Sequence, residues 1–112
     1  MRPRAFVLEE QRRDLDMSTL AKYGDLCYVF PKNVKRPSVF SGDLYLQRLY
    51  DRLQELDFNP DVDYIVAVGG IVELVLSIGE LSSCFTKLKL LVYCSTASRY
   101  VDRNIGINCR SD

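Results

Sequence analysis

The stretch that decides the fold is Tyr64-Ile65-Val66-Ala67-Val68-Gly69-Gly70-Ile71. Its first five residues are apolar on both faces, which is the pattern of a central strand covered on either side. Two glycines follow, and they lead into an apolar run at 71–81 that has the length of a helix. A buried strand that turns directly into a helix is typical of α/β proteins with a parallel sheet.

Similar elements surround this stretch on both sides. Compact apolar runs predict strands at 4–8, 26–30 and 89–94. The alternating segment 99–105 predicts an antiparallel edge strand, because its charges would guard the edge against other sheets. The segment 16–23 begins with residues that can cap a helix, and it predicts a short helix. We expect Gly24 to end this helix by adopting the left-handed conformation.

The clearest helix lies at about 43–56. Its apolar residues recur at spacings of three and four and form one stripe: Tyr45, Leu46, Leu49, Tyr50, Leu53 and Leu56. The full order is then strand, helix, strand, helix, strand, helix, strand, strand. This order predicts a small α/β sandwich of two or three layers, with a mostly parallel sheet of four to five strands and an antiparallel edge strand.

Length and composition exclude several classes of protein. The 112 residues fit one domain, which we place at 1–106, and 107–112 lack periodicity and are expected to fray. An apolar content of 47% excludes intrinsic disorder over most of the chain. No apolar run approaches the roughly 18 residues of a membrane-spanning helix. The apolar stretch near the first residue is too short for the hydrophobic region of a signal peptide. We therefore expect a cytoplasmic protein without membrane contact.

The formal net charge is zero, so no global field attracts nucleic acid. The charges are nevertheless segregated along the chain. Residues 1–40 carry eight basic and five acidic groups, 41–83 carry two and eight, and 84–112 carry five and two. This distribution indicates either a two-faced surface or an ordinary scatter of solvated charge.

The residue types give little support to catalysis or to a cofactor. There is no histidine to serve as the base of a serine nucleophile. The cysteines are too far apart for a zinc site, so we expect reduced thiols and neither a metal nor another cofactor; they are Cys27, Cys84, Cys94 and Cys109. We expect no catalytic residue and no enzyme. The enzymatic alternative would use Asp61 and Asp63 with a divalent metal, although the spacing is not that of a calcium loop.

The helix at 71–81 is apolar almost all round, and only Glu73, Ser77 and Glu80 form a narrow polar stripe. A helix covered on every side is hard to arrange in so short a chain, so we expect it to contact a partner. The partner is a second copy of the chain or another protein. The residues predicted at this interface are Ile71, Val72, Val75, Leu76 and Ile78.

The alternative function is nucleotide or nucleic-acid binding. Gly69 and Gly70 stand where a strand meets a helix, a junction whose free N–H groups can bind phosphate. The loop 31–42 adds cations that could contact a nucleic-acid backbone; they are Lys32, Lys35 and Arg36. Against this hypothesis, the stretch matches neither the dinucleotide fingerprint nor the P-loop. The glycines can equally make only a tight turn, and the loop can simply be solvated.

Three segments resemble small uncharacterised α/β proteins encoded by tailed bacteriophages. They are Arg4-Ala5-Phe6-Val7-Leu8, Tyr23-Gly24-Asp25-Leu26 and Phe58-Asn59-Pro60-Asp61-Val62-Asp63-Tyr64. The resemblance covers about two-thirds of the chain and includes no catalytic motif. It implies a viral protein that acts in a bacterial cytoplasm.

Overall fold

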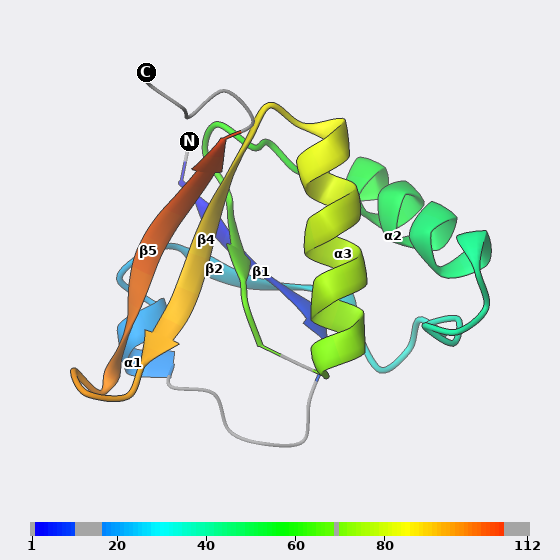
Figure 1. Cartoon of the computed structure of the whole chain (residues 1–112). Helices are drawn as coiled ribbons and strands as arrows, with labels where there is room; N and C mark the ends of the chain where they lie inside the picture. Colours follow the sequence, from blue (N-terminus) through cyan, green and yellow to red (C-terminus); the bar gives the residue numbers. More distant parts are fainter. Residues whose placement is uncertain (1, 11–16, 69, 107–112) are drawn as a thin grey trace.

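The computed structural model describes residues 2–10, 17–68 and 70–106, which form one sheet and three helices (Figure 1). The strands are β1 (Arg4–Glu9), β2 (Asp25–Phe30), β3 (Tyr64–Val66), β4 (Lys87–Cys94) and β5 (Arg99–Gly106). The helices are α1 (Met17–Leu20), α2 (Asp43–Glu55) and α3 (Ile71–Cys84). The predicted α/β class and the predicted order of elements are confirmed.

The strands lie in the order β2-β1-β3-β4-β5. The pairs β1–β2, β1–β3 and β3–β4 are parallel, and β4–β5 is antiparallel. The prediction of a mostly parallel sheet with an antiparallel edge strand is therefore confirmed. Parallel neighbours require crossover connections, and the segments that contain α1, α2 and α3 supply them.

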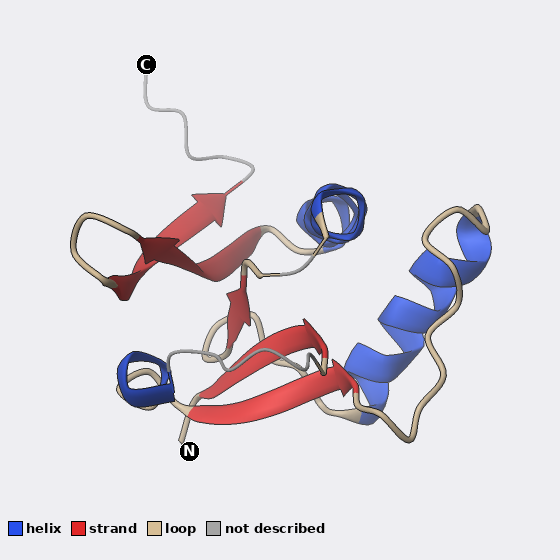
Figure 2. Cartoon of the chain, turned by 90° about the horizontal axis from the view of Figure 1, so that it is seen from below, coloured by secondary structure: helices blue, strands red, loops and turns tan. Residues whose placement is uncertain are grey.

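The two faces of the sheet are covered unequally (Figure 2). Helices α2 and α3 pack on one face, where Phe6 and Leu8 of β1 belong to the larger core. The short helix α1 lies on the other face, where Ala5 and Val7 belong to a smaller core with Leu20. Because successive side chains of a strand point to opposite faces, the apolar run of β1 serves both cores.

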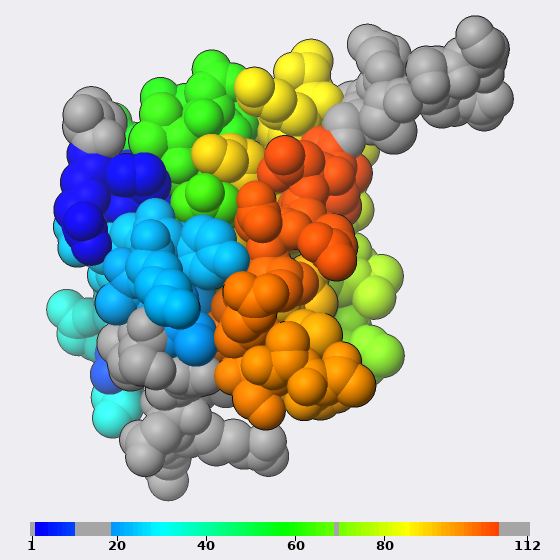
Figure 3. Space-filling view, turned by 90° about the vertical axis from the view of Figure 1, so that its left-hand side faces the viewer, coloured from blue at the N-terminus to red at the C-terminus, as the bar shows by residue number. Residues whose placement is uncertain are grey.

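The smaller core is closed by a contact between segments that are distant in sequence. Figure 3 shows the α1 region beside β5 on this surface. The hydroxyl of Tyr23 donates to the backbone carbonyl of Tyr100 at 3.2 Å. The ring of Tyr100 is buried and meets the Tyr93 ring edge-on. Edge strand β5 is thereby fixed to the turn that follows α1, as well as to β4.

The start of β1 is attached to the turn before β3 by a buried carboxylate. Asp63 is 2% exposed, and it accepts hydrogen bonds from the backbone N–H of Arg4 at 3.0 Å and of Asn59 at 2.9 Å. The Arg4 guanidinium also reaches the Asp63 carboxylate, at 3.3 Å. Asp63 therefore supports the fold and is not free for a metal.

One expectation about a glycine is wrong. Gly24 does not adopt the left-handed conformation, which among the described glycines is found at Gly42, with φ of 69°. Gly24 is required for a different reason, because a Cβ there would overlap the backbone carbonyl of Pro3. The close approach lets Asp25 donate its N–H to that carbonyl at 3.1 Å and begin β2.

Candidate interaction surface

Helix α3 turns its polar stripe toward the protein interior. Glu73 and Ser77 are buried together with Leu81, although they are the polar residues of an apolar helix. The hydroxyls of Ser77 and Tyr45 of α2 form a hydrogen bond of 2.6 Å. This bond satisfies both buried hydroxyls and sets the rotation of α3 against α2.

A group of charged side chains fixes the first turns of α3. The guanidinium of Arg36, in the loop after β2, lies 3.0 Å from the carboxylate of Glu9 and 3.5 Å from that of Glu73. The Arg36 side chain also lies over the ring of Tyr45. Among the described residues, Oε2 of Glu73 finds no hydrogen-bond partner. Burial, followed by repulsion from Glu9, raises the pKa of Glu73, while Arg36 opposes that change.

With Glu73 and Ser77 buried, α3 presents apolar side chains to solvent. Ile71 is 78% exposed and Val75 is 66% exposed, and Val72 and Leu76 are each more than one-third exposed. We call these four residues the outer face of α3. Ile78, which the sequence also suggests for an interface, instead packs partly buried against the larger core. The outer face carries no charged residue, because the two acidic residues of α3 are Glu73, which is buried, and Glu80, which borders α2.

The strand-to-helix junction and the basic loop meet at the carboxyl ends of the parallel strands. Gly70 precedes α3 and is exposed, with open space where a Cβ would stand, whereas Gly69 lies outside the described residues. Lys32 pairs with Glu10 at 3.8 Å, and Arg36 is held by Glu9 and Glu73 as described above. These three carboxylates do not favour a phosphate at this junction.

The cations of this loop and those of the last strand do not form a common basic patch. Lys35 is exposed and forms no ion pair with a described residue. The loop follows β2, which is one edge of the sheet, whereas β5 is the opposite edge. The whole width of the sheet therefore separates Lys32 from the arginines of β5, Arg99 and Arg103.

The described residues offer no evident metal centre. They contain no group of three or more cysteine, aspartate or glutamate side chains that could hold an ion. Cys27, Cys84 and Cys94 are free thiols, and Cys109 lies outside the described residues. None of the described helices has the length and apolar character needed to cross a membrane.

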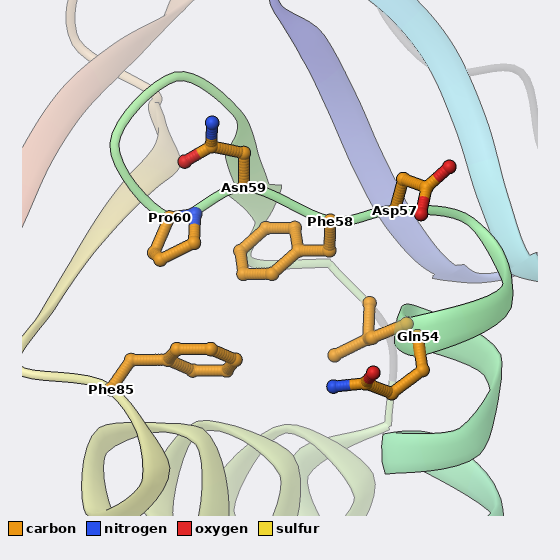
Figure 4. Close-up of a pocket in the computed structure, with 7 residues that line it drawn as sticks. Gln54, Asp57, Phe58, Asn59, Pro60 and Phe85 are labelled. Carbon is orange, nitrogen blue, oxygen red and sulfur yellow. The ribbon is translucent and has the colours of Figure 1, made fainter.

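A cavity of about 350 Å³ lies where α2 and α3 end. In Figure 4 the rings of Phe58 and Phe85 lie next to each other at this cavity, while the carboxylate of Asp57 points away. The rings meet edge-on, with their centroids 5.6 Å apart. Asp57 has a left-handed backbone, with φ of 56°, and ends α2. The wall therefore combines these rings with the amide side chains of Gln54 and Asn59.

The charged group at Glu9, Arg36 and Glu73 was missed from the sequence, where carboxylates showed no convincing pairing. A usable signal existed, because Glu9 ends one parallel strand and Glu73 stands in the first turn after its neighbour. The carboxyl ends of adjacent parallel strands lie at one edge of the sheet. Their common partner, Arg36, comes from an irregular loop and has no such signal.

Comparison with known proteins identifies a family. No curated protein and no solved structure matches the chain significantly. A family model described as phage Pam3 gp32-like protein matches residues 3–107. The match spans the whole sheet and all three helices, and it agrees with the resemblance to small phage proteins. The chain therefore belongs to the phage Pam3 gp32-like family.

Proposed function

We propose that this phage protein is a non-enzymatic accessory protein of the host cytoplasm, and that it self-associates through the outer face of α3. The observation that carries the proposal is the orientation of α3, which buries the polar residues Glu73 and Ser77 and exposes the apolar residues Ile71 and Val75. Burying such side chains contributes about 1.5–3 kcal/mol for each one fully removed from water. A second chain supplies a surface able to do this.

The absence of charge on the outer face favours a second copy as the partner. Two copies related by a two-fold axis bring the same surface together, so any charge on it would face its own like. Valine, isoleucine and leucine side chains meet without such a cost. Glu80 lies on the flank toward α2 and stays clear of the contact.

Gly79 gives a further argument for close helix packing. It lies three residues after Leu76 and four after Val75, so it shares their side of the helix. A Cβ at Gly79 would meet nothing within 4 Å, so the fold of one chain does not require glycine there. Glycine within a helix costs about 0.5–1 kcal/mol relative to alanine. A second α3 crossing at this point would make use of the missing side chain.

The test compares Val75→Glu with Leu44→Glu, because these residues are 66% and 62% exposed and Leu44 lies on α2. Light scattering across a tenfold range of protein concentration should show self-association of the wild type and of Leu44→Glu. Val75→Glu should be monomeric, with self-association weakened at least about a hundredfold, because a two-fold contact receives the charge twice. Circular dichroism checks that both variants remain folded. A wild type that is monomeric throughout would refute self-association.

A further inference from the structure

A groove of about 440 Å³ runs between α2 and α3. Its lining comes from two stripes at helical spacing: Asp43, Leu46, Gln47 and Tyr50 of α2, and Glu80 and Cys84 of α3. The α2 stripe covers two turns, or about 10 Å of helix. That length matches roughly three residues of an extended peptide.

The charged groups of the groove are both acidic. Asp43 and Glu80 provide two carboxylates, and neither forms an ion pair with a described residue. By contrast, Glu55 on another side of α2 is paired with Arg48 and Arg52. No lysine or arginine lines the groove, so it carries uncompensated negative charge.

The other lining groups leave this charge unchanged. The NH₂ group of Gln47 donates a hydrogen bond to the carboxylate of Asp51 at 3.0 Å. The carbonyl oxygen of the Gln47 side chain therefore stays available as an acceptor. The Cys84 thiol lies 3.6 Å from the Glu80 carboxylate. Burial and the nearby Glu80 raise the pKa of Cys84, so the thiol stays protonated at neutral pH.

The groove also has an apolar wall, formed by Leu46 and the ring of Tyr50. Tyr50 is 38% exposed, so its ring is open to a ligand. Lysine and arginine side chains lay their alkyl stems on such surfaces and keep the charged end near polar groups. A cation can in addition lie over the tyrosine ring.

We propose that the α2–α3 groove binds a lysine or arginine side chain carried by a basic segment of a partner protein. The ammonium or guanidinium group is placed at the carboxylates of Asp43 and Glu80, and the alkyl stem contacts Leu46 and Tyr50. The elongated shape favours a peptide over a compact ligand. This site is separate from the outer face of α3, so it does not depend on self-association.

The experiment uses the full chain and a short fluorescent peptide that alternates lysine and alanine. Fluorescence anisotropy should show saturable binding that weakens with added salt. A peptide with glutamate in place of lysine should not bind. Glu80→Gln should raise the Kd about tenfold, because the bound cation loses a charge-assisted hydrogen bond. Glu55→Gln is the matched control and should leave the Kd unchanged.

A second readout locates the peptide. Cys84 lines the groove and is exposed, so the bound lysine peptide should slow its alkylation by iodoacetamide, whereas Cys94 should be unaffected. Absence of saturable binding would overturn the proposal. So would equal weakening by Glu80→Gln and Glu55→Gln, because that result indicates attraction to the general negative charge. A free alkyl diamine that binds as tightly as the peptide would overturn the assignment to a protein segment.

Discussion

Replacing Glu73 by methionine should stabilise the protein, although it removes an ion pair. Glu73 is 5% exposed, and among the described residues its Oε2 forms no hydrogen bond and has only the 3.5 Å ion-pair contact with Nε of Arg36. An unsatisfied buried acceptor costs about 1–3 kcal/mol. Arg36 keeps its 3.0 Å contact with Glu9 after the substitution, so no buried cation is left alone. Methionine is unbranched and adapts to the space of the glutamate side chain.

We expect the free energy of unfolding to rise by about 1–2 kcal/mol at pH 7, because the cost of burying the Glu73 carboxylate exceeds the small net stability contributed by its long contact with Arg36. For a chain of this size the gain corresponds to roughly 5–10 °C in Tm. The measurement is thermal and urea unfolding followed by circular dichroism, at one protein concentration because the proposed self-association would shift Tm.

The gain should depend on pH, and its sign follows from the raised pKa of Glu73. When the pKa of a carboxyl in the folded protein exceeds its ordinary value of 4.5, the protein loses stability as the pH rises from 4.5 through the pKa of the folded state. Methionine has no such loss. The advantage of Glu73→Met should therefore be full at neutral pH and smaller at pH 4.

A matched control is Glu80→Met, which alters a half-buried glutamate one face away on α3. It should change the free energy of unfolding by no more than about 0.5 kcal/mol. A destabilised Glu73→Met protein would refute the reasoning. An equal gain at pH 4 and pH 7 would show that ionisation of Glu73 is not the cause.

Two further predictions concern other polar groups of the described chain. Asp63→Ala leaves the backbone N–H groups of Arg4 and Asn59 without their acceptor, and urea unfolding should show a loss of about 3–5 kcal/mol; a loss below about 1 kcal/mol would contradict the role given to this carboxylate. Cys94 should be alkylated faster than Cys84 at pH 8, as measured by mass spectrometry of the digested protein. A hydrogen bond from a neighbouring threonine lowers the pKa of the Cys94 thiol, whereas burial raises that of Cys84; the reverse order of rates would contradict the prediction.

The sheet and α2 could be predicted from the sequence because their patterns have one interpretation. The stripe of α2 contains Tyr45, Leu49 and Leu53, and these are the residues of α2 that the structure buries. The apolar run at 64–68 could only be a strand covered on both faces, and β3 lies within it, between β1 and β4. Local periodicity is sufficient where polar and apolar residues divide cleanly between two sides.

The orientation of α3 could not be predicted in this way. Apolar residues occupy most of its circumference, so periodicity does not select the side that faces the core. The choice is made by Ser77, which meets Tyr45, and by Glu73, which meets Arg36. These partners lie 32 and 37 residues away in the chain. A pattern confined to the helix contains no information about them.

The shortness of β3 makes it a seam between two halves of the sheet. It pairs with β1 and β4 through Tyr64, Ile65 and Val66, and Ala67 adds one hydrogen bond to Leu91 of β4, whereas β4 and β5 pair along the whole of their length. The two strands of the β4–β5 hairpin are therefore paired more extensively with each other than β4 is paired with β3. Under mechanical load or partial denaturation the sheet should separate at β3, and the β4–β5 hairpin should detach as a unit. Amide protons of β3 should then exchange with deuterium before those of the β4–β5 ladder.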